Sequence, residues 1–242
     1  MSAFQFSEEL RDDLREVRFS FEEDGERVPG ALWMPSETDE AMPLVFIQHP
    51  GTGSKDDYFV SQPAQLWARR GWICAGLDAP MHGDRDDYDP MGLFREKELQ
   101  PIIAQQFAAE VSSAIDHIAS QYPVDMSRIG YVGYSLGSML GIPAVSKDGR
   151  FRAAAFCLVG EGGFVGPATG PESYVPGLAG VAVRIVAKQS DELIGRESTE
   201  ALYEALPGEK ELIWLPGGHF EIGPDVIKSA EEWMKRQLGE GA

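Results

Sequence analysis

The sequence predicts an α/β domain in which a mostly parallel sheet of eight strands is covered by helices on both faces. Short apolar runs alternate along the chain with segments of helical periodicity, which is typical of such sheets. The 242 residues are 43% hydrophobic and 25% charged, so the chain can bury one large core and has an ordinary globular composition. No repeat or linker-like stretch interrupts the pattern, and residues 1–242 are expected to form a single domain.

Each expected strand is a short, largely apolar run bounded by turn-forming residues. The first two strands flank Asp24-Gly25, a hairpin signal, so an antiparallel pair should open the sheet. The third lies between Pro43 and Pro50 and suits a strand buried on both faces. The eight expected strands are 17–21, 28–33, 44–48, 72–77, 129–132, 153–159, 181–187 and 211–215.

The expected helices carry apolar residues three or four positions apart. The clearest begins near Pro101, a residue that suits the first turn of a helix. In sheets of this kind the chemistry lies in loops after the carboxyl ends of the strands, and those loops hold the candidate residues. The other expected helices are 58–70, 136–145, 197–206 and 224–238.

The charge of the chain argues against two classes of partner. Acidic residues outnumber basic ones 39 to 21, which gives a formal net charge of −18. This field repels phosphate backbones and anionic lipid, so neither nucleic acid nor a membrane surface is an expected partner. We find no signal peptide in the first thirty residues and no apolar run long enough to span a membrane. Solubility explains the acidity, with adaptation to salt as the alternative.

Two cysteines, Cys74 and Cys157, both lie in apolar, strand-like segments. Cysteine is among the most buried residue types, so both are expected to be inert, reduced thiols in the core. Reduced thiols favour a cytoplasmic location. No feature of the sequence predicts an oligomeric state.

The strongest chemical motif is G-Y-S-L-G at 133–137, which fits the G-x-S-x-G pattern of a nucleophile elbow. It stands between an expected strand and an expected helix, which is the setting that the motif requires. The glycines leave room for neighbouring backbone at a sharp, strained turn, and the helix N-terminus favours an anion developing beside Ser135. Ser135 is therefore the expected nucleophile; the alternative is that it only caps the helix.

A serine nucleophile needs a base, and the chain has four histidines: His49, His82, His117 and His219. His219 lies in a glycine-rich loop after the last strand, downstream of the serine, as the Ser…Asp/Glu…His order of such sites requires. We expect His219 to be the base, with a role in lining the pocket as the alternative. His117 lies inside the long helix and is expected to be a packing or surface residue.

The base needs an acid that holds its tautomer and stabilises its cationic form. Asp191 follows the strand 181–187 and is the natural candidate. Its alternative role is to cap a helix that starts near Ile194. Glu192 is the nearest substitute for the acid, and Glu161 is a more distant one.

Acyl transfer also needs donors for the oxyanion, and backbone N–H groups suit this because they are fixed before the charge forms. Leu136, directly after the nucleophile, should supply one donor. The other should come from the loop after the strand 44–48, where Pro50 has no N–H. Gly51 is the expected donor and Thr52 the reserve. The loop lacks the G-x-x-x-x-G-K-[ST] pattern, so it is not expected to bind phosphate.

On these residues, the chain resembles the α/β-hydrolase superfamily, and within it the dienelactone-hydrolase-like and acyl-peptidase-like esterases. Beyond the elbow, V-D-M-S-R-I-G at 124–130, D-A-P-M-H-G-D at 78–84 and H-P-G at 49–51 are similar to segments of that family. The resemblance spans residue 44 to the C-terminus. It implies the strand order 1-2-4-3-5-6-7-8, which places Cys74 and Cys157 three strand spacings apart.

The chain also departs from the family pattern. Pro50 replaces the usual glycine, and Ser138 stands where a second glycine often follows the elbow. Dienelactone hydrolases proper use a cysteine nucleophile, while dehalogenases and epoxide hydrolases of this fold use aspartate. Their specific reactions are therefore not expected of this chain.

The resemblance and the residues together predict a serine esterase that acts on a small-molecule ester through an acyl-enzyme and needs no metal or organic cofactor. Residues 160–180 are expected to form a short cap over a modest pocket, which favours short acyl chains, and 84–99 a second wall. The expected pocket side chains are Tyr134, Phe164 and Phe220. Alternatively, both segments are ordinary surface loops.

Three rival functions remain from the sequence. A peptidase or a thioesterase would use the same triad. A non-catalytic module could hold a ligand in the same cleft, although such a module should have lost triad members. A metal hydrolase would have to use His49, His82 and Asp84, yet no ligand-dense motif such as H-E-x-x-H is present.

Overall fold

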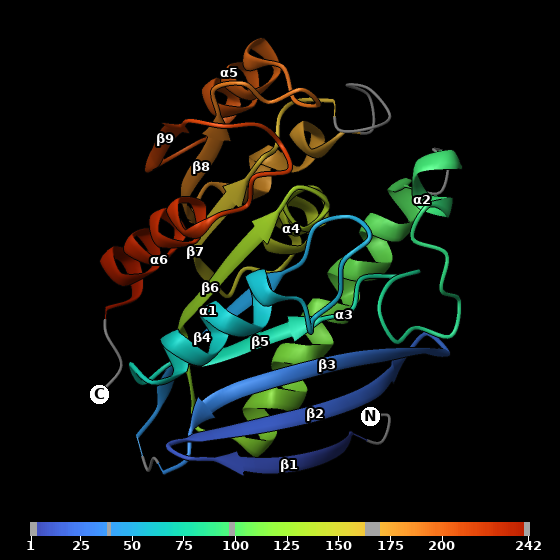
Figure 1. Cartoon of the computed structure of the whole chain (residues 1–242), viewed down its shortest axis with the longest axis vertical. Coiled ribbons are helices and arrows are strands. Elements are labelled where there is room, and N and C mark those ends of the chain that lie inside the picture. The colour runs from blue at the N-terminus through green and yellow to red at the C-terminus, as the bar shows by residue number, and fades with distance from the viewer. Residues whose placement is uncertain (1–3, 38–39, 97–99, 163–169, 240–242) are drawn as a thin grey trace.

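The computed structural model describes residues 4–37, 40–96, 100–162 and 170–239. One nine-stranded sheet runs through the molecule in the order β1-β2-β3-β5-β4-β6-β7-β8-β9 (Figure 1). Strands from β5 to β9 in this order pair in parallel, whereas β1, β2, β3 and β5 pair antiparallel. The strands are β1 Gln5–Arg11, β2 Leu14–Glu23, β3 Glu26–Pro35, β4 Met42–Gln48, β5 Ile73–Leu77, β6 Val124–Tyr134, β7 Phe151–Cys157, β8 Ala182–Lys188 and β9 Lys210–Leu215.

All eight expected strands are present, and without β1 their order is the predicted 1-2-4-3-5-6-7-8. The predicted number of strands was wrong, because β1 forms an additional edge strand. Every residue of β1 is exposed, so neither of its faces carries the apolar alternation that identifies a strand in a sequence. Its partner is β2, with Gln5 opposite Ser20 and Arg11 opposite Leu14.

The hairpin predicted at Asp24-Gly25 joins β2 to β3. Asp24 has φ of 51° and Gly25 has φ of 86°, so both turn residues lie in the left-handed region. Two-residue turns of this kind match the twist of the flanking strands, and aspartate and glycine tolerate them best.

Helices cover both faces of the sheet (Figure 1). Trp67 and Trp233, from α1 and α6, are fully buried in the hydrophobic layer on one face. Phe107 and Ile142, from α3 and α4, are buried in the layer on the other face. Within the described residues, no helix is long and apolar enough to cross a membrane. The helices are α1 Tyr58–Ala68, α2 Gly92–Arg95, α3 Gln100–Gln121, α4 Leu136–Lys147, the 3₁₀ helix η2 Pro171–Leu178, α5 Arg196–Ala205 and α6 Pro224–Leu238.

The two cysteines are buried and free, on β5 and β7. Strands β4 and β6 lie between β5 and β7, so Cys74 and Cys157 are three strand spacings apart, or roughly 14 Å. A disulfide requires Cα atoms within about 7 Å. Burial also raises the pKa of both thiols well above the usual value, which disfavours the reactive thiolate.

Because the parallel strands all end at the same edge of the sheet, the loops that follow them lie along that edge. The central strands β4 and β6 end at Gln48 and Tyr134, and β8 and β9 end at Lys188 and Leu215. In open α/β sheets this carboxyl edge is where ligands bind. The loops after these four strands carry the candidate residues.

Candidate active site

Ser135 occupies the sharp turn between β6 and α4 and has φ of 50° and ψ of −109°. A non-glycine residue in this region is strained, and such strain is found where function requires it. The flanking glycines are sterically required: a Cβ on Gly133 would lie 2.5 Å from backbone atoms of Gly137, and a Cβ on Gly137 would lie 2.5 Å from the carbonyl oxygen of Gln48. The turn therefore needs glycine at both positions.

Neighbouring backbone holds the elbow in place. The N–H of Ser135 donates to the carbonyl of Cys157 at 2.8 Å, which ties the turn to the end of β7. Ser138, which departs from the family pattern, is completely buried. Its hydroxyl lies 2.7 Å from the carbonyl oxygen of Gly133 and 2.8 Å from that of Cys157. Ser138 thus stabilises the turn through its contacts with Gly133 and Cys157.

The structure brings Ser135, His219 and Asp191 together from three separate loops. The Oγ of Ser135 lies 2.8 Å from Nε2 of His219. The Nδ1 of His219 lies 2.9 Å and 3.0 Å from the two carboxylate oxygens of Asp191. With the proton on Nδ1 donated to Asp191, Nε2 is left to accept the proton of the serine hydroxyl. The serine and the histidine are both buried, at 7% and 4% exposure.

Backbone donors fix the Asp191 carboxylate. Its Oδ1 accepts the N–H groups of Leu193 at 2.9 Å and Ile194 at 2.7 Å. The nearby helix α5 begins at Arg196 with Gly195 as its N-cap, so Asp191 does not cap it. The carboxylate is thereby oriented towards His219.

The other two acidic candidates do not contact the imidazole of His219. The carboxylate of Glu192 accepts the backbone N–H of His219 at 2.9 Å and so holds the histidine loop. The backbone of Glu161 pairs with Ser198 of α5. From the sequence, Glu192 was only the nearest substitute for the acid. Its hydrogen bond to the backbone of His219 was not predicted.

A cavity of about 570 Å³ opens beside Ser135 and His219. Phe220 lies at its mouth and is 77% exposed. Tyr134 does not line the cavity; it is completely buried, with its ring against Phe59. The predicted Phe164 lies outside the described residues. The lining residues are Pro50, Gly51, Thr52, Gly53, Asp57, Tyr58, Phe59, Met91, Phe94, Ser135, Leu193, His219, Phe220 and Ile222.

Most of the cavity wall is apolar. Its carboxylate, Asp57, already accepts the N–H of Ser54 at 2.8 Å. The described part of the insertion 84–99 contributes Met91 and Phe94 to the cavity wall, in agreement with the prediction. The described part of 160–180 contributes no lining residue, and a cap there stays a prediction.

Of the two expected oxyanion donors, Gly51 lines the cavity, and Leu136 directly follows the lining residue Ser135. Leu136 is the first residue of α4, where N–H groups have no partner within the helix. Gly51 lines the cavity and packs beneath Phe94: a Cβ on it would lie 2.7 Å from the ring. The next residue, Thr52, has φ of 64°. The backbone is therefore strained directly after Gly51, the expected donor.

The remaining histidines have other surroundings. His117 stacks on Phe4 and packs against Phe21, in agreement with its predicted packing role. Both ring nitrogens of His49 bond to backbone, and Asp84 bonds to Lys55. Across the described ranges, no three histidine, cysteine or acidic side chains converge as metal ligands. The rival set of His49, His82 and Asp84 is therefore not assembled.

No family model matches the sequence. A curated relative, hydrolase acrC of Aspergillus aculeatus, is 23% identical over 152 residues. The match covers 59% of this chain and 33% of that protein, so this chain spans only about a third of the relative's length.

Solved structures match over nearly the whole chain. A cold-adapted esterase from an Arctic intertidal metagenomic library is 28% identical, with a TM-score of 0.82, and the match covers 98% of this chain and 99% of that one. A Klebsiella pneumoniae protein assigned as a dienelactone hydrolase is 18% identical, with a TM-score of 0.75 over 93% and 98% of the two chains.

The sheet and its helices have the α/β-hydrolase fold, which these neighbours share. The chain is a hydrolytic enzyme, similar to esterases and to dienelactone-hydrolase-like proteins. The resemblance predicted from the sequence is confirmed.

Proposed function

We propose that this enzyme cleaves carboxylic esters by way of an acyl-enzyme on Ser135, with His219 as general base and Asp191 as its orienting acid. The observation that carries the proposal is the hydrogen-bonded chain from the serine through the histidine to the aspartate, at 2.8 Å and 2.9 Å, beside an apolar cavity. This arrangement provides a nucleophile, a base and an orienting group in hydrogen-bond contact.

In the first half of the reaction, the Oγ of Ser135 attacks the ester carbonyl while Nε2 of His219 takes its proton. The carbonyl electrons move onto oxygen, and the N–H groups of Gly51 and Leu136 stabilise this oxyanion. The negative charge of Asp191 stabilises the imidazolium. The oxyanion then collapses, the ester C–O bond breaks, and the leaving alcohol takes the proton from His219.

Water completes the cycle. His219 removes a proton from a water molecule as its oxygen attacks the acyl carbon, and the same two N–H groups stabilise the second oxyanion. Collapse breaks the bond to Ser135, which regains a proton from His219 and releases the carboxylic acid. Every proton transfer in this scheme uses protein groups, substrate and water.

We further propose a small, neutral ester with a short acyl chain as the substrate. The cavity of about 570 Å³ suits a small molecule, and its largely apolar wall supports an uncharged ligand. The net charge of −18 would repel anionic substrates at long range. We also propose the cytoplasmic location that was predicted from the sequence.

Replacement of the nucleophile tests the proposed function. Ser135→Ala should abolish hydrolysis of a panel of p-nitrophenyl esters while leaving the thermal unfolding temperature nearly unchanged. A fluorophosphonate probe should label the wild type and not the variant. Comparable turnover by the two proteins would overturn the assignment.

A further inference from the structure

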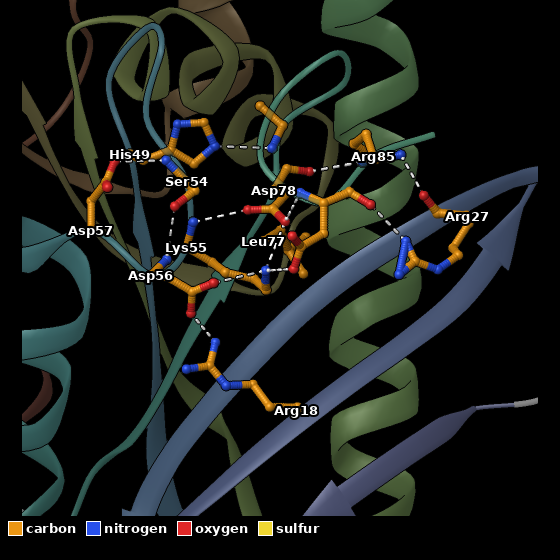
Figure 2. Close-up of polar contacts among 12 residues, drawn as sticks. Arg18, Arg27, His49, Ser54, Lys55, Asp56, Asp57, Leu77, Asp78 and Arg85 are labelled. Atoms are coloured by element: carbon orange, nitrogen blue, oxygen red, sulfur yellow. Dashed lines mark hydrogen bonds and ion pairs between the residues drawn. The ribbon is translucent and has the colours of Figure 1, made fainter. Parts of the chain in front are cut away.

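The loop that carries the expected oxyanion donor Gly51 is attached at both ends to one neighbouring segment. That segment is Asp78-Ala79, directly after the end of β5. His49 at the start of the loop contacts Ala79, and Lys55 at its end contacts Asp78 (Figure 2). We call the Lys55–Asp78 pair the loop clamp.

The attachment at the start uses an uncharged imidazole. The backbone N–H of Ala79 donates to Nε2 of His49 at 3.0 Å, and Nδ1 of His49 lies 2.8 Å from the carbonyl oxygen of Pro50. Nδ1 therefore carries the proton. Burial lowers the pKa of His49 to about 4, so the ring remains neutral and able to accept near pH 7.

The loop clamp itself is a buried ion pair with two points of contact. The backbone N–H of Lys55 donates to one oxygen of Asp78 at 2.9 Å, and its ammonium donates to the other at 2.8 Å. Lys55 is 3% exposed and Asp78 is fully buried. The ammonium also reaches Asp84 at 2.7 Å and Asp56 at 3.1 Å. Burial acts to lower the pKa of Lys55, but the charges and hydrogen bonds of Asp78, Asp84 and Asp56 together outweigh it, and that pKa is raised.

Asp78 is in turn fixed to the rest of the fold. Its carboxylate accepts the N–H of Asp84 at 2.8 Å and packs against Gly83, where a Cβ would lie 2.1 Å from its Cγ. Arg85 donates to the backbone carbonyl of Asp78 and forms a buried ion pair with Glu110 of α3. The clamp is therefore connected to a helix of the core.

The segment between the two attachments needs such support. Pro50, Gly51, Thr52 and Gly53 all line the cavity, and the positive φ of Thr52 is unfavourable for a residue with a β-branched side chain. Oxyanion stabilisation depends on donors that are aimed before the charge develops, within a few tenths of an ångström. A loop free to relax would lose that aim.

We propose that Lys55 and Asp78 are positioning residues for the oxyanion hole, which hold the Gly51 N–H in place for the transition state. This inference rests on the proposed function. A positioning role differs from that of an ordinary structural ion pair in its effect on kinetics. Loss of the loop clamp should lower kcat, while substrate binding by the apolar wall, and hence KM, stays nearly unchanged.

The experiment compares Lys55→Met, Lys55→Gln and Lys55→Arg with the wild type. The matched control is Arg184→Met, which removes another buried cation, 6% exposed and paired with Glu211 on the far strands β8 and β9. Each protein is assayed for kcat and KM on one p-nitrophenyl ester, for inhibition by phenylboronic acid, whose tetrahedral adduct mimics the oxyanion, and for thermal unfolding.

We expect Lys55→Met to lower kcat by about 10- to 100-fold, with KM changed less than about threefold and the boronic acid bound correspondingly more weakly. Lys55→Arg should restore most of the loss. Arg184→Met should lose thermal stability and keep its kcat. If Lys55→Met does not fold, Lys55→Gln tests the same expectation. Because glutamine keeps a hydrogen-bond donor, its kcat should fall by a smaller factor.

A folded Lys55→Met or Lys55→Gln variant with the kcat and boronic acid affinity of the wild type would overturn the inference, as would a change in kcat no greater than that of Arg184→Met. Either result leaves the proposed function standing if the fluorophosphonate labels Ser135. A wild type that hydrolyses the ester without labelling at Ser135 would overturn both.

Discussion

Asp191 and His219 lie 28 positions apart in the sequence, yet the carboxylate of one is 2.9 Å from Nδ1 of the other. The aspartate also accepts two backbone N–H groups of its own loop, and the histidine backbone is held by Glu192. Two adjacent acidic residues thus have separate tasks: Asp191 contacts the ring, and Glu192 contacts the main chain.

This division predicts unequal effects of two isosteric changes. Asp191→Asn should reduce kcat by about 10³- to 10⁴-fold, because an amide favours the wrong histidine tautomer. Glu192→Gln should reduce it only a few-fold, since an amide oxygen can still accept the N–H of His219. Steady-state kinetics on one ester measures both. If Glu192→Gln were the more damaging change, Glu192 would be the triad acid.

Close packing in the nucleophile elbow predicts different stabilities for two glycine-to-alanine variants. A Cβ on Gly137 would lie within 3 Å of the backbone oxygens of Gln48 and His49, whereas a Cβ on Gly149 meets nothing within 4 Å. Gly137→Ala should therefore destabilise the fold by several kcal/mol, and Gly149→Ala should be nearly neutral. Chemical denaturation gives both free energies of unfolding. Equal stabilities of the two variants would contradict the close backbone packing at Gly137.

Phe220 at the mouth of the cavity predicts a change in KM. Its side chain is 77% exposed and lines the opening, so Phe220→Ala should raise KM for aromatic esters by about 3- to 10-fold with a smaller effect on kcat. Leu66→Ala, an equally apolar change on the exposed face of α1, serves as the control. An unchanged KM in Phe220→Ala would exclude this residue from substrate binding.

The buried His49 predicts a loss of stability in mild acid. Burial lowers its pKa to about 4 from a usual value of 6.5, so between these values the unfolded chain binds a proton that the folded chain excludes. Stability from this group is complete above pH 6.5 and is lost as the pH falls towards 4, by about 3 kcal/mol at most. Chemical denaturation at several pH values between 4 and 6.5 gives the free energy of unfolding. This free energy should change less steeply with pH in His49→Gln than in the wild type. Identical slopes would contradict the buried, neutral ring.

The cysteines give a test of the strand order. Both thiols should react with a thiol reagent in the unfolded, unreduced protein, and neither should react quickly in the folded protein, because burial raises their pKa values. A disulfide between Cys74 and Cys157 in a peptide map would be incompatible with two intervening strands.

Local sequence predicts the parts of the site that depend on local geometry. The elbow at Ser135 combines glycines, a strand and a helix within a short segment, and Asp191 and His219 each follow a strand that delivers them to the same edge. These three residues can therefore be proposed from the sequence alone. The strand order followed from the family resemblance.

Other parts depend on tertiary contacts that leave no pattern in the sequence. The edge strand β1 is exposed on both faces, so no apolar periodicity marks it. Phe94 meets Gly51 only because an insertion folds over the cavity, and Lys55 meets Asp78 only because β4 and β5 are neighbours. Charged residues in loops are usually solvated, and their sequence alone gave no reason to pair these two.

Isolation of the acyl-enzyme tests the central claim most directly. The enzyme is mixed with a p-nitrophenyl ester, quenched in acid within milliseconds, digested and mapped by mass spectrometry. The mechanism predicts one acyl group, on the peptide that contains Ser135, with none in Ser135→Ala. An acyl group on another residue of an active enzyme, or full turnover by Ser135→Ala, would contradict it.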